Sequence, residues 1–93
     1  MKIGETRVGR RIYTDANGYL PPFAEGDYGQ GLDGGWCARP PGAHLGDLRN
    51  HEVAEHEDGT ITVTPSILIT GEDEHRATRW HGHLERGVWR RIK

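Results

Sequence analysis

The residues of this sequence with the most chemical potential are its six histidines, above all His81 and His83. Alternate residues of a β-strand point to the same side, roughly 6.5–7 Å apart, so this pair could bind one Zn²⁺ with two further ligands from elsewhere in the chain. Those ligands could be Cys37, His51, His56 or acidic residues. The spacing is not diagnostic, because there is no second close ligand pair. Surface or hydrogen-bonded histidines are the alternative, and we predict neither a metal nor another cofactor.

Cys37 and Ser66 are the side chains to consider as nucleophiles. Cys37 is the only cysteine, which excludes an intrachain disulfide, and a lone cysteine beside Trp36 is more often a small buried hydrophobic residue. Ser66 follows Pro65 and lacks the Gly-x-Ser-x-Gly context of hydrolases. The sequence has neither a P-loop nor a dinucleotide-binding fingerprint. We therefore predict no catalytic residues and a protein that is not an enzyme.

Aromatic and arginine side chains gather in two segments, residues 13–39 and 79–91. Such side chains dominate the binding energy of many protein interfaces. The first segment holds more aromatic residues than a thin core can take, so some should remain on the surface. The residues predicted to contact a partner protein are Tyr19, Phe23, Tyr28, Arg79, Arg86 and Arg90. The alternative is that the aromatic rings only seal this segment onto the rest of the fold.

Charge is unevenly distributed, although the formal net charge is only −2. Acidic residues dominate from Asp47 to Glu74, and basic residues gather near both ends of the chain. Surface ion pairs between the ends and the middle would explain this pattern, and a basic patch for an acidic partner is the alternative. Nucleic-acid-binding proteins usually carry a basic surface, so nucleic acid is not the expected partner.

The elements that must position these residues begin with a hairpin at Asp58-Gly59. This dipeptide between two β-prone runs is a strong signal for a two-residue turn. Such a turn pairs His56 with Ile61. It then places Ala54, His56, Ile61 and Val63 on the core face.

A second hairpin is predicted around Arg86-Gly87, with Leu84 paired to Trp89. It places Trp80, Gly82, Leu84, Trp89 and Arg91 on one face, and His81, His83, Glu85, Val88, Arg90 and Ile92 on the other. Between the hairpins, Pro65 should stop or bend its strand because it cannot donate a ladder hydrogen bond. The run 67–69 should be a buried strand, and residues 71–75 a solvated loop. The residues predicted to be mostly buried are Ile61, Val63, Ile67, Ile69, Leu84 and Trp89.

The first half of the chain is less regular. Residues 1–13 could form one or two edge strands. Residues 14–50 are dense in glycine and proline, which argues against a long helix or a long central strand. We expect a loop layer packed on a sheet by its aromatic residues, with a flexible arm as the alternative. The predicted fold is mostly β: a small antiparallel sheet of two hairpins over residues 51–93 and a Gly/Pro-rich, loop-rich layer over residues 1–50, together one domain, 1–93.

The size of the chain predicts a thin core. It has 93 residues, of which 33% are hydrophobic, and a domain this small buries only about 60–65% of the surface of its unfolded chain. A homodimer would bury further apolar surface. No apolar run approaches the roughly 18 residues of a membrane span, and the first residues lack the apolar region of a signal peptide. We therefore expect a cytoplasmic protein.

Two strings, HEVAEHEDGTITVTPSILI and WHGHLERGVWR, resemble a family of small uncharacterised accessory proteins of phages that infect actinobacteria. The preceding WCARPPGAHLGDL is similar to the same family, so the resemblance covers about residues 36–92. The turn at Thr64-Pro65-Ser66-Ile67 is more distantly similar to a wider domain of bacteria and phages, whose members often carry several cysteines suggestive of zinc. This chain has only Cys37, so it departs from that pattern.

The resemblance implies a phage accessory protein acting in the cytoplasm of the infected bacterial host. With no catalytic constellation in the sequence, we predict that it binds a host protein, for host takeover, growth inhibition or superinfection exclusion. A small zinc-binding or nucleic-acid-binding module, using His81 and His83 or the arginines of residues 79–91, is the alternative.

Overall fold

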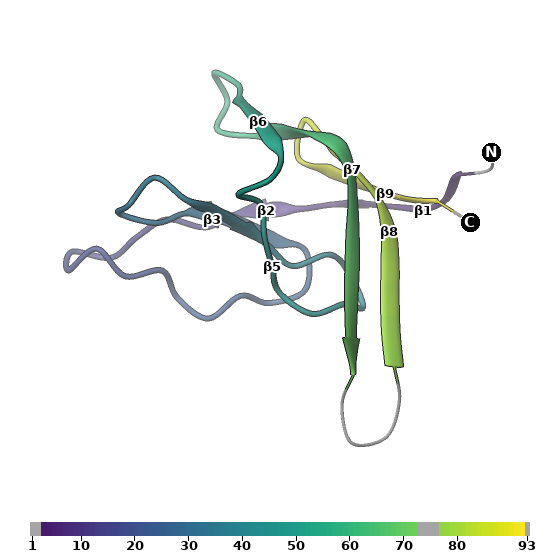
Figure 1. Cartoon of the computed structure of the whole chain (residues 1–93). Helices are drawn as coiled ribbons and strands as arrows, with labels where there is room; N and C mark the ends of the chain where they lie inside the picture. The colour runs from purple at the N-terminus through teal and green to yellow at the C-terminus, as the bar shows by residue number, and fades with distance from the viewer. Residues whose placement is uncertain (1–2, 73–76, 93) are drawn as a thin grey trace.

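The computed structural model describes residues 3–72 and 77–92 and confirms a mostly β fold. The described residues form two sheets (Figure 1) and contain no helix, so none that could span a membrane. The strands are β1 (Ile3–Val8), β2 (Arg10–Arg11), β3 (Asp27–Gln30), β4 (Trp36–Ala38), β5 (Gly46–Asp47), β6 (Glu52–Glu55), β7 (Ile61–Glu72), β8 (Ala77–Glu85) and β9 (Val88–Ile92).

The larger sheet has the order β1-β9-β8-β7-β6 and is antiparallel throughout. Its β8–β9 hairpin turns at Arg86-Gly87 and pairs Leu84 with Trp89, as predicted. Both turn residues have positive φ angles, 46° and 76°, as a type I′ turn requires. The face predicted for Trp80, Leu84 and Trp89 is the inner one, because all three are buried, as predicted for Leu84 and Trp89.

The β6–β7 hairpin turns at Asp58-Gly59, as predicted, but its loop has three residues instead of two. The N–H of His56 donates to the carbonyl oxygen of Thr60 at 2.8 Å, which leaves residues 57–59 in the loop. Gly59 has a φ of 87°, consistent with a type I turn followed by a left-handed residue.

The extra loop residue makes the predicted face of β6 wrong. Val53, rather than Ala54, pairs with Val63, and its side chain packs against the core. Ala54 is exposed, and His56 is hydrogen-bonded to Thr62 with 2.7 Å between Nε2 and Oγ1. The physical reason is the period of two in a strand, by which a register shift of one residue moves every side chain to the opposite face.

Pro65 bends β7 without ending it. The pairing of β7 with β8 shifts register between Val63 and Ile67, and the strand then continues to Glu72. The prediction that residues 67–69 form a buried strand holds only in part, since Ile67 is buried, Ile69 is half-buried and Leu68 is 51% exposed. Of the predicted solvated loop, residues 71–72 end β7 and residues 73–75 lie outside the described residues.

The first half of the chain contains a second sheet, which the predicted loop layer did not include. Its order is β2-β3-β4-β5, with β2 parallel to β3 and the other pairs antiparallel. Long loops extend from this sheet (Figure 1). The expected edge strands of residues 1–13 are confirmed as β1 at the edge of the larger sheet and β2 at the edge of the smaller one.

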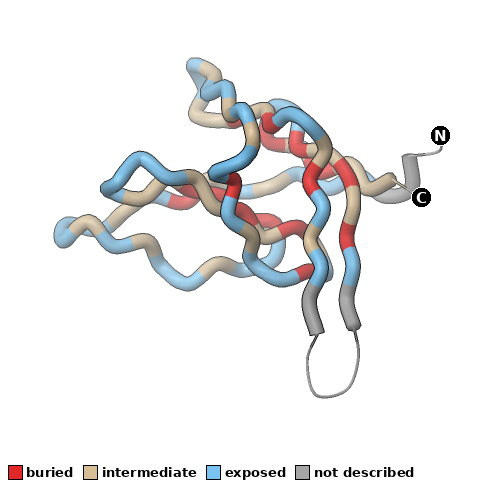
Figure 2. Tube along the Cα trace, in the orientation of Figure 1, coloured by how far each residue is buried: buried red, intermediate tan, exposed pale blue. Residues whose placement is uncertain are grey.

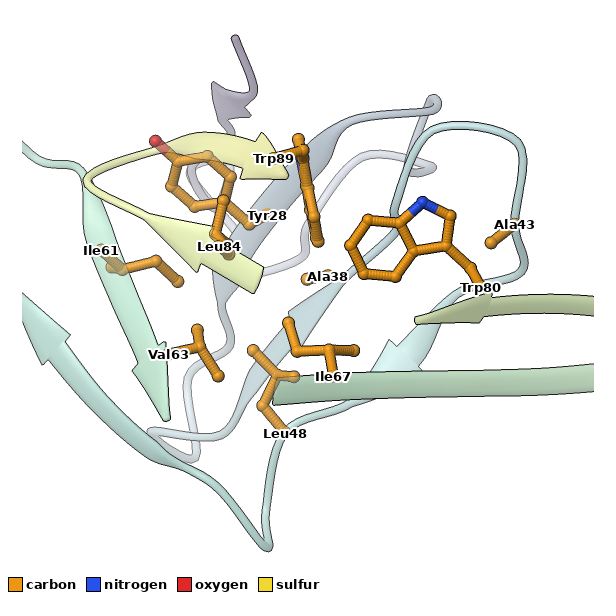
Figure 3. Packing of buried hydrophobic residues seen from close by; sticks show 10 residues of the cluster. All are labelled: Tyr28, Ala38, Ala43, Leu48, Ile61, Val63, Ile67, Trp80, Leu84 and Trp89. Carbon is orange, nitrogen blue, oxygen red and sulfur yellow. The ribbon is translucent and has the colours of Figure 1, made fainter. Parts of the chain in front are cut away.

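The core lies where the two sheets face each other. Buried residues gather there, while the loop tips are exposed (Figure 2). Both halves of the chain contribute to the core (Figure 3), through Tyr28, Ala38, Ala43, Leu48, Ile61, Val63, Ile67, Trp80, Leu84 and Trp89. The rings of Trp80 and Trp89 meet edge to face with centroids 5.3 Å apart. Of the six residues predicted to be buried, only Ile69 is half-exposed.

Candidate functional site

Tyr19 lies on a tight turn that is closed by hydrogen bonds within residues 15–19. The N–H of Asp15 donates to the carbonyl oxygen of Tyr19 at 2.8 Å. The carboxylate of Asp15 accepts hydrogen bonds from the N–H groups of Asn17 and Tyr19, at 2.8 and 3.0 Å. Aspartate favours such turns because its short side chain can satisfy backbone donors of the following residues. The backbone that carries Tyr19 is therefore held in place.

Leu32 lies on a second closed turn, between β3 and β4. The N–H of Gly31 donates to the carbonyl oxygen of Gly35 at 2.9 Å, and the N–H of Gly35 donates to the carboxylate of Asp33 at 2.9 Å. Gln30 adds a side-chain hydrogen bond to the carbonyl oxygen of Gly34. Apart from Leu32 and Asp33, residues 31–35 are glycines, which allow the tight reversal.

The two turns touch each other. A Cβ atom at Gly18 would lie 2.1 Å from Cδ1 of Leu32, so the leucine side chain lies directly against this glycine. Tyr19, the next residue, is 71% exposed and Leu32 is 78% exposed. We call these two side chains the loop-tip patch. Exposed large apolar side chains held on rigid turns can contact a partner with little loss of conformational entropy.

The other two predicted aromatic contacts lie elsewhere. Phe23 is half-buried, and its carbonyl oxygen accepts a hydrogen bond of 3.0 Å from Nη1 of Arg39. Tyr28 is only 1% exposed and belongs to the core. Its ring is not accessible to a partner in the folded protein, so the prediction that Tyr28 is a surface contact is wrong. A tyrosine on a short strand facing the larger sheet fills the core instead.

The predicted arginines do not form one basic patch. Arg79 lies near one end of β8 and Arg86 in the turn beyond its other end, roughly 20 Å away at the rise of a β-strand. Arg90 is half-buried, with its Nε 3.9 Å from Oε1 of Glu85.

Arg86 instead lies among acidic residues. It lines a surface cavity of about 530 Å³ at the β6–β7 turn, together with Glu55, His56, Glu57 and Asp58. Three carboxylates next to one guanidinium group give this cavity a net negative charge, so Arg86 does not extend a basic surface. We call it the acidic cavity.

His81 and His83 lie on β8, as predicted, and His81 has a specific partner. Nε2 of His81 and Oγ of Ser66 are 2.9 Å apart, and Nε2 of His51 is 3.2 Å from the carbonyl oxygen of Ser66. Within the part of the chain that the structure describes, no three His, Cys, Asp or Glu side chains are grouped to hold a metal ion. His81 and His51 thus join Ser66 of β7 to β8 and to the residue that directly precedes β6.

The described surroundings of the two candidate nucleophiles, Ser66 and Cys37, differ. Ser66 and His81 are close enough for a nucleophile and its base, but a triad also needs a third group that orients the base. Among residues 6–70 and 79–92, no carboxylate is hydrogen-bonded to His81. Burial of Cys37, together with the nearby Asp47 and Asp33, raises the pKa of its thiol, which disfavours the reactive thiolate.

Arg11 forms a contact that the sequence analysis did not find. Its guanidinium group lies between the rings of Tyr13 and Trp36, 4.7 Å from each centroid. Its Nη1 donates to Glu55 and to the carbonyl oxygen of Gly59, both at 2.9 Å. The contact links β2 of the smaller sheet to the β6–β7 hairpin of the larger one. Trp36 is thus partly buried and takes part in a contact inside the fold.

Leu32 was also missed as a candidate contact, although the sequence held a signal for it. An apolar side chain within a run of glycines, Gly31-Leu32-Asp33-Gly34-Gly35, has few neighbours of its own to pack against.

Comparison of the chain with protein-family models, curated proteins and solved structures found no match.

Proposed function

We propose that this protein is a non-enzymatic phage accessory protein that binds a host cytoplasmic protein through the loop-tip patch. The observation that carries the proposal is the position of Tyr19 and Leu32, two large and mostly exposed side chains on two hydrogen-bonded turns that touch at Gly18. Tyrosine is among the residues that contribute most to interfaces, because it buries a large area and keeps a polar end.

The surroundings of the patch support a binding role. Both turns are closed by hydrogen bonds, so the partner need not order a flexible loop. The phage context and its consequences, host takeover, growth inhibition or superinfection exclusion, rest on the resemblance of residues 36–92 described above.

A pull-down with crosslinking tests the proposal. Wild-type protein and a Tyr19→Ala/Leu32→Ala double variant are incubated with lysate of the host, and the captured proteins are compared. The matched control is Val8→Ala, which removes a side chain that is 79% exposed on the larger sheet. Circular dichroism and thermal melting establish that each variant is folded. We expect one host protein to be enriched by the wild type and by the control, and lost with the double variant.

Other outcomes contradict the proposal. If the wild type enriches no protein above background, the binding function is wrong. If the double variant captures the same protein as the wild type, the assignment of the patch is wrong. Single Arg79→Ala, Arg86→Ala and Arg90→Ala variants show which of the three separated arginines lies in the same interface.

A further inference from the structure

A second surface cavity lies where β9 ends beside β8. β9 stops at Ile92, while β8 begins at Ala77, and the pairing of the two strands begins only at Gly82 and Arg91. The larger sheet therefore loses one strand at this point. The cavity has a volume of about 410 Å³ and is lined by Arg79, His81, Arg91 and Ile92. We call it the β9-end cavity.

The charge of this lining is the reverse of that of the acidic cavity. None of the described residues that line it is acidic, and two carry a guanidinium group. Arg91 pairs with Gly82 and so starts from the face opposite Arg79 and His81, but its Nη2 lies 3.4 Å from the backbone carbonyl oxygen of Arg79, and the residue lines the same cavity. The planar, forked donors of arginine match the oxygens of phosphate better than a point charge does.

His81 is held beside these arginines by β7. Its Nε2 lies 2.9 Å from Oγ of Ser66, which fixes the orientation of the imidazole ring. The same residue lines the cavity. A polar ring with a fixed orientation, two guanidinium groups and one apolar side chain form a mixed lining, and sites for small molecules combine such groups.

We propose that the β9-end cavity binds the phosphate group of a small phosphate monoester. Arg79 and Arg91 contact the phosphate oxygens, His81 donates a hydrogen bond, and Ile92 contacts the organic part of the ligand. The volume lies within the usual range of small-molecule sites, roughly 300–1,000 Å³. A nucleic-acid strand would need basic surface that continues beyond the cavity. Of the other predicted contacts along the hairpin, Arg90 lies 3.9 Å from a carboxylate oxygen of Glu85, and Arg86 lies in the acidic cavity.

Nuclear magnetic resonance of the full chain tests this site. Inorganic phosphate and AMP are titrated in turn, with ionic strength held constant by chloride, and the ring signals of His81 are followed. We expect a saturable shift with both ligands. An Arg91→Gln variant should weaken the affinity about tenfold or more, as expected for the loss of a charged hydrogen bond. Arg90→Gln is the matched control, because Arg90 is adjacent on β9 but does not line the cavity.

The outcomes decide between the site and its alternatives. An Arg79→Gln variant gives an independent measurement should Arg91→Gln not fold, which the backbone amide spectrum shows. If neither phosphate nor AMP gives a saturable shift, the site is wrong. Equal weakening by Arg90→Gln and Arg91→Gln would mean general attraction of anions and would also overturn it. Binding of a single-stranded oligothymidylate without binding of AMP would replace the proposal with a nucleic-acid surface.

Discussion

Nε1 of Trp89 donates a buried hydrogen bond of 3.0 Å to the carbonyl oxygen of Gly26. Trp89 belongs to β9 of the larger sheet, and Gly26 directly precedes β3 of the smaller one. The same carbonyl oxygen accepts a hydrogen bond from the N–H of Arg10 at 3.0 Å. One carbonyl group therefore joins the larger sheet to the start of β2, and the two sheets meet around it.

Replacing Trp89 with phenylalanine should weaken this junction. The Trp89→Phe variant keeps an aromatic ring but removes the N–H donor and leaves space in the core. We expect the free energy of unfolding to fall by about 1–3 kcal/mol, from the lost hydrogen bond and imperfect packing. Urea denaturation followed by circular dichroism measures the change. Tyr19→Phe, on the surface, should change it by less than about 0.5 kcal/mol. Equal stability of the two variants would contradict the role of the bond.

Gly9 marks the crossing of the chain from β1 to β2, and an alanine there should be poorly tolerated. A Cβ atom would lie 2.8 Å from Nε1 of Trp89 and 2.9 Å from the carbonyl oxygen of Gly26. Both atoms belong to the junction and cannot move freely, so Gly9→Ala should cost about 1–3 kcal/mol of stability through overpacking. In Gly35→Ala, the nearest atom is a carboxylate oxygen of Asp33 at 3.2 Å, which needs to move by only a few tenths of an ångström. If thermal melting shows that the control is destabilised as much as Gly9→Ala, the steric explanation is wrong.

Asp27 should make stability depend on pH in the acidic range. It is buried, and burial alone would raise the pKa of its carboxyl group. Arg10 donates two hydrogen bonds to this carboxylate, at 3.0 and 2.8 Å, and the N–H of Ala24 donates a third. Together with the positive charges of Arg10 and Arg39, these hydrogen bonds outweigh the effect of burial, so the pKa of Asp27 is lowered. The stability from Asp27 is thus fully present above its unfolded pKa of about 3.9 and is lost as pH falls through the folded pKa.

Comparison of wild type with Asp27→Asn isolates this contribution. Asp47 and Asp58 also have lowered pKa values, through hydrogen bonds from Arg49 and Thr60, so the wild type loses stability in acid for several reasons. The variant should be less stable by about 1–3 kcal/mol at pH 7, because it loses charged hydrogen bonds. The difference should shrink as the pH falls below about 4. Denaturation curves at pH 7, 5, 4 and 3 measure it, and a constant difference would contradict the lowered pKa.

Two leucines with opposite surroundings test the position of the core. Leu84 is completely buried between the sheets, so Leu84→Ala should cost about 2–4 kcal/mol through lost burial and a cavity. Leu68 is half-exposed on the protruding part of β7, and Leu68→Ala should cost less than about 1 kcal/mol. Urea denaturation of both variants gives the comparison. Similar costs would show that the core is not where the two sheets face each other.

The two hairpins show how far local sequence specifies structure. At Arg86-Gly87, two residues that both adopt positive φ close the turn, and the pairing of Leu84 with Trp89 follows from it directly. At Asp58-Gly59, the dipeptide marks the turn but is compatible with loops of two or three residues. The longer loop lets Val53 pair with Val63 and pack against the core, and only the completed core selects that register.

The smaller sheet could not be predicted in this way. Its strands have only two to four residues, too few for alternation to be visible in them. They form because Tyr28 and Ala38 fill the space opposite the larger sheet. Of the candidate sites, the sequence predicted only some of the residues. Tyr19 was predicted as exposed, whereas Leu32 and the proximity of Arg79 to Arg91 depend on contacts between distant segments.

The sequence by itself determined the mostly β fold, the positions of both hairpin turns and the inner face of the β8–β9 hairpin. These features depend on φ preferences and on the period of two, which act between residues close together in the chain. The tertiary structure alone decided the register of β6, the burial of Tyr28 and the separation of the basic from the acidic cavity. Those features depend on which distant surfaces exclude water together, and no local pattern records that choice.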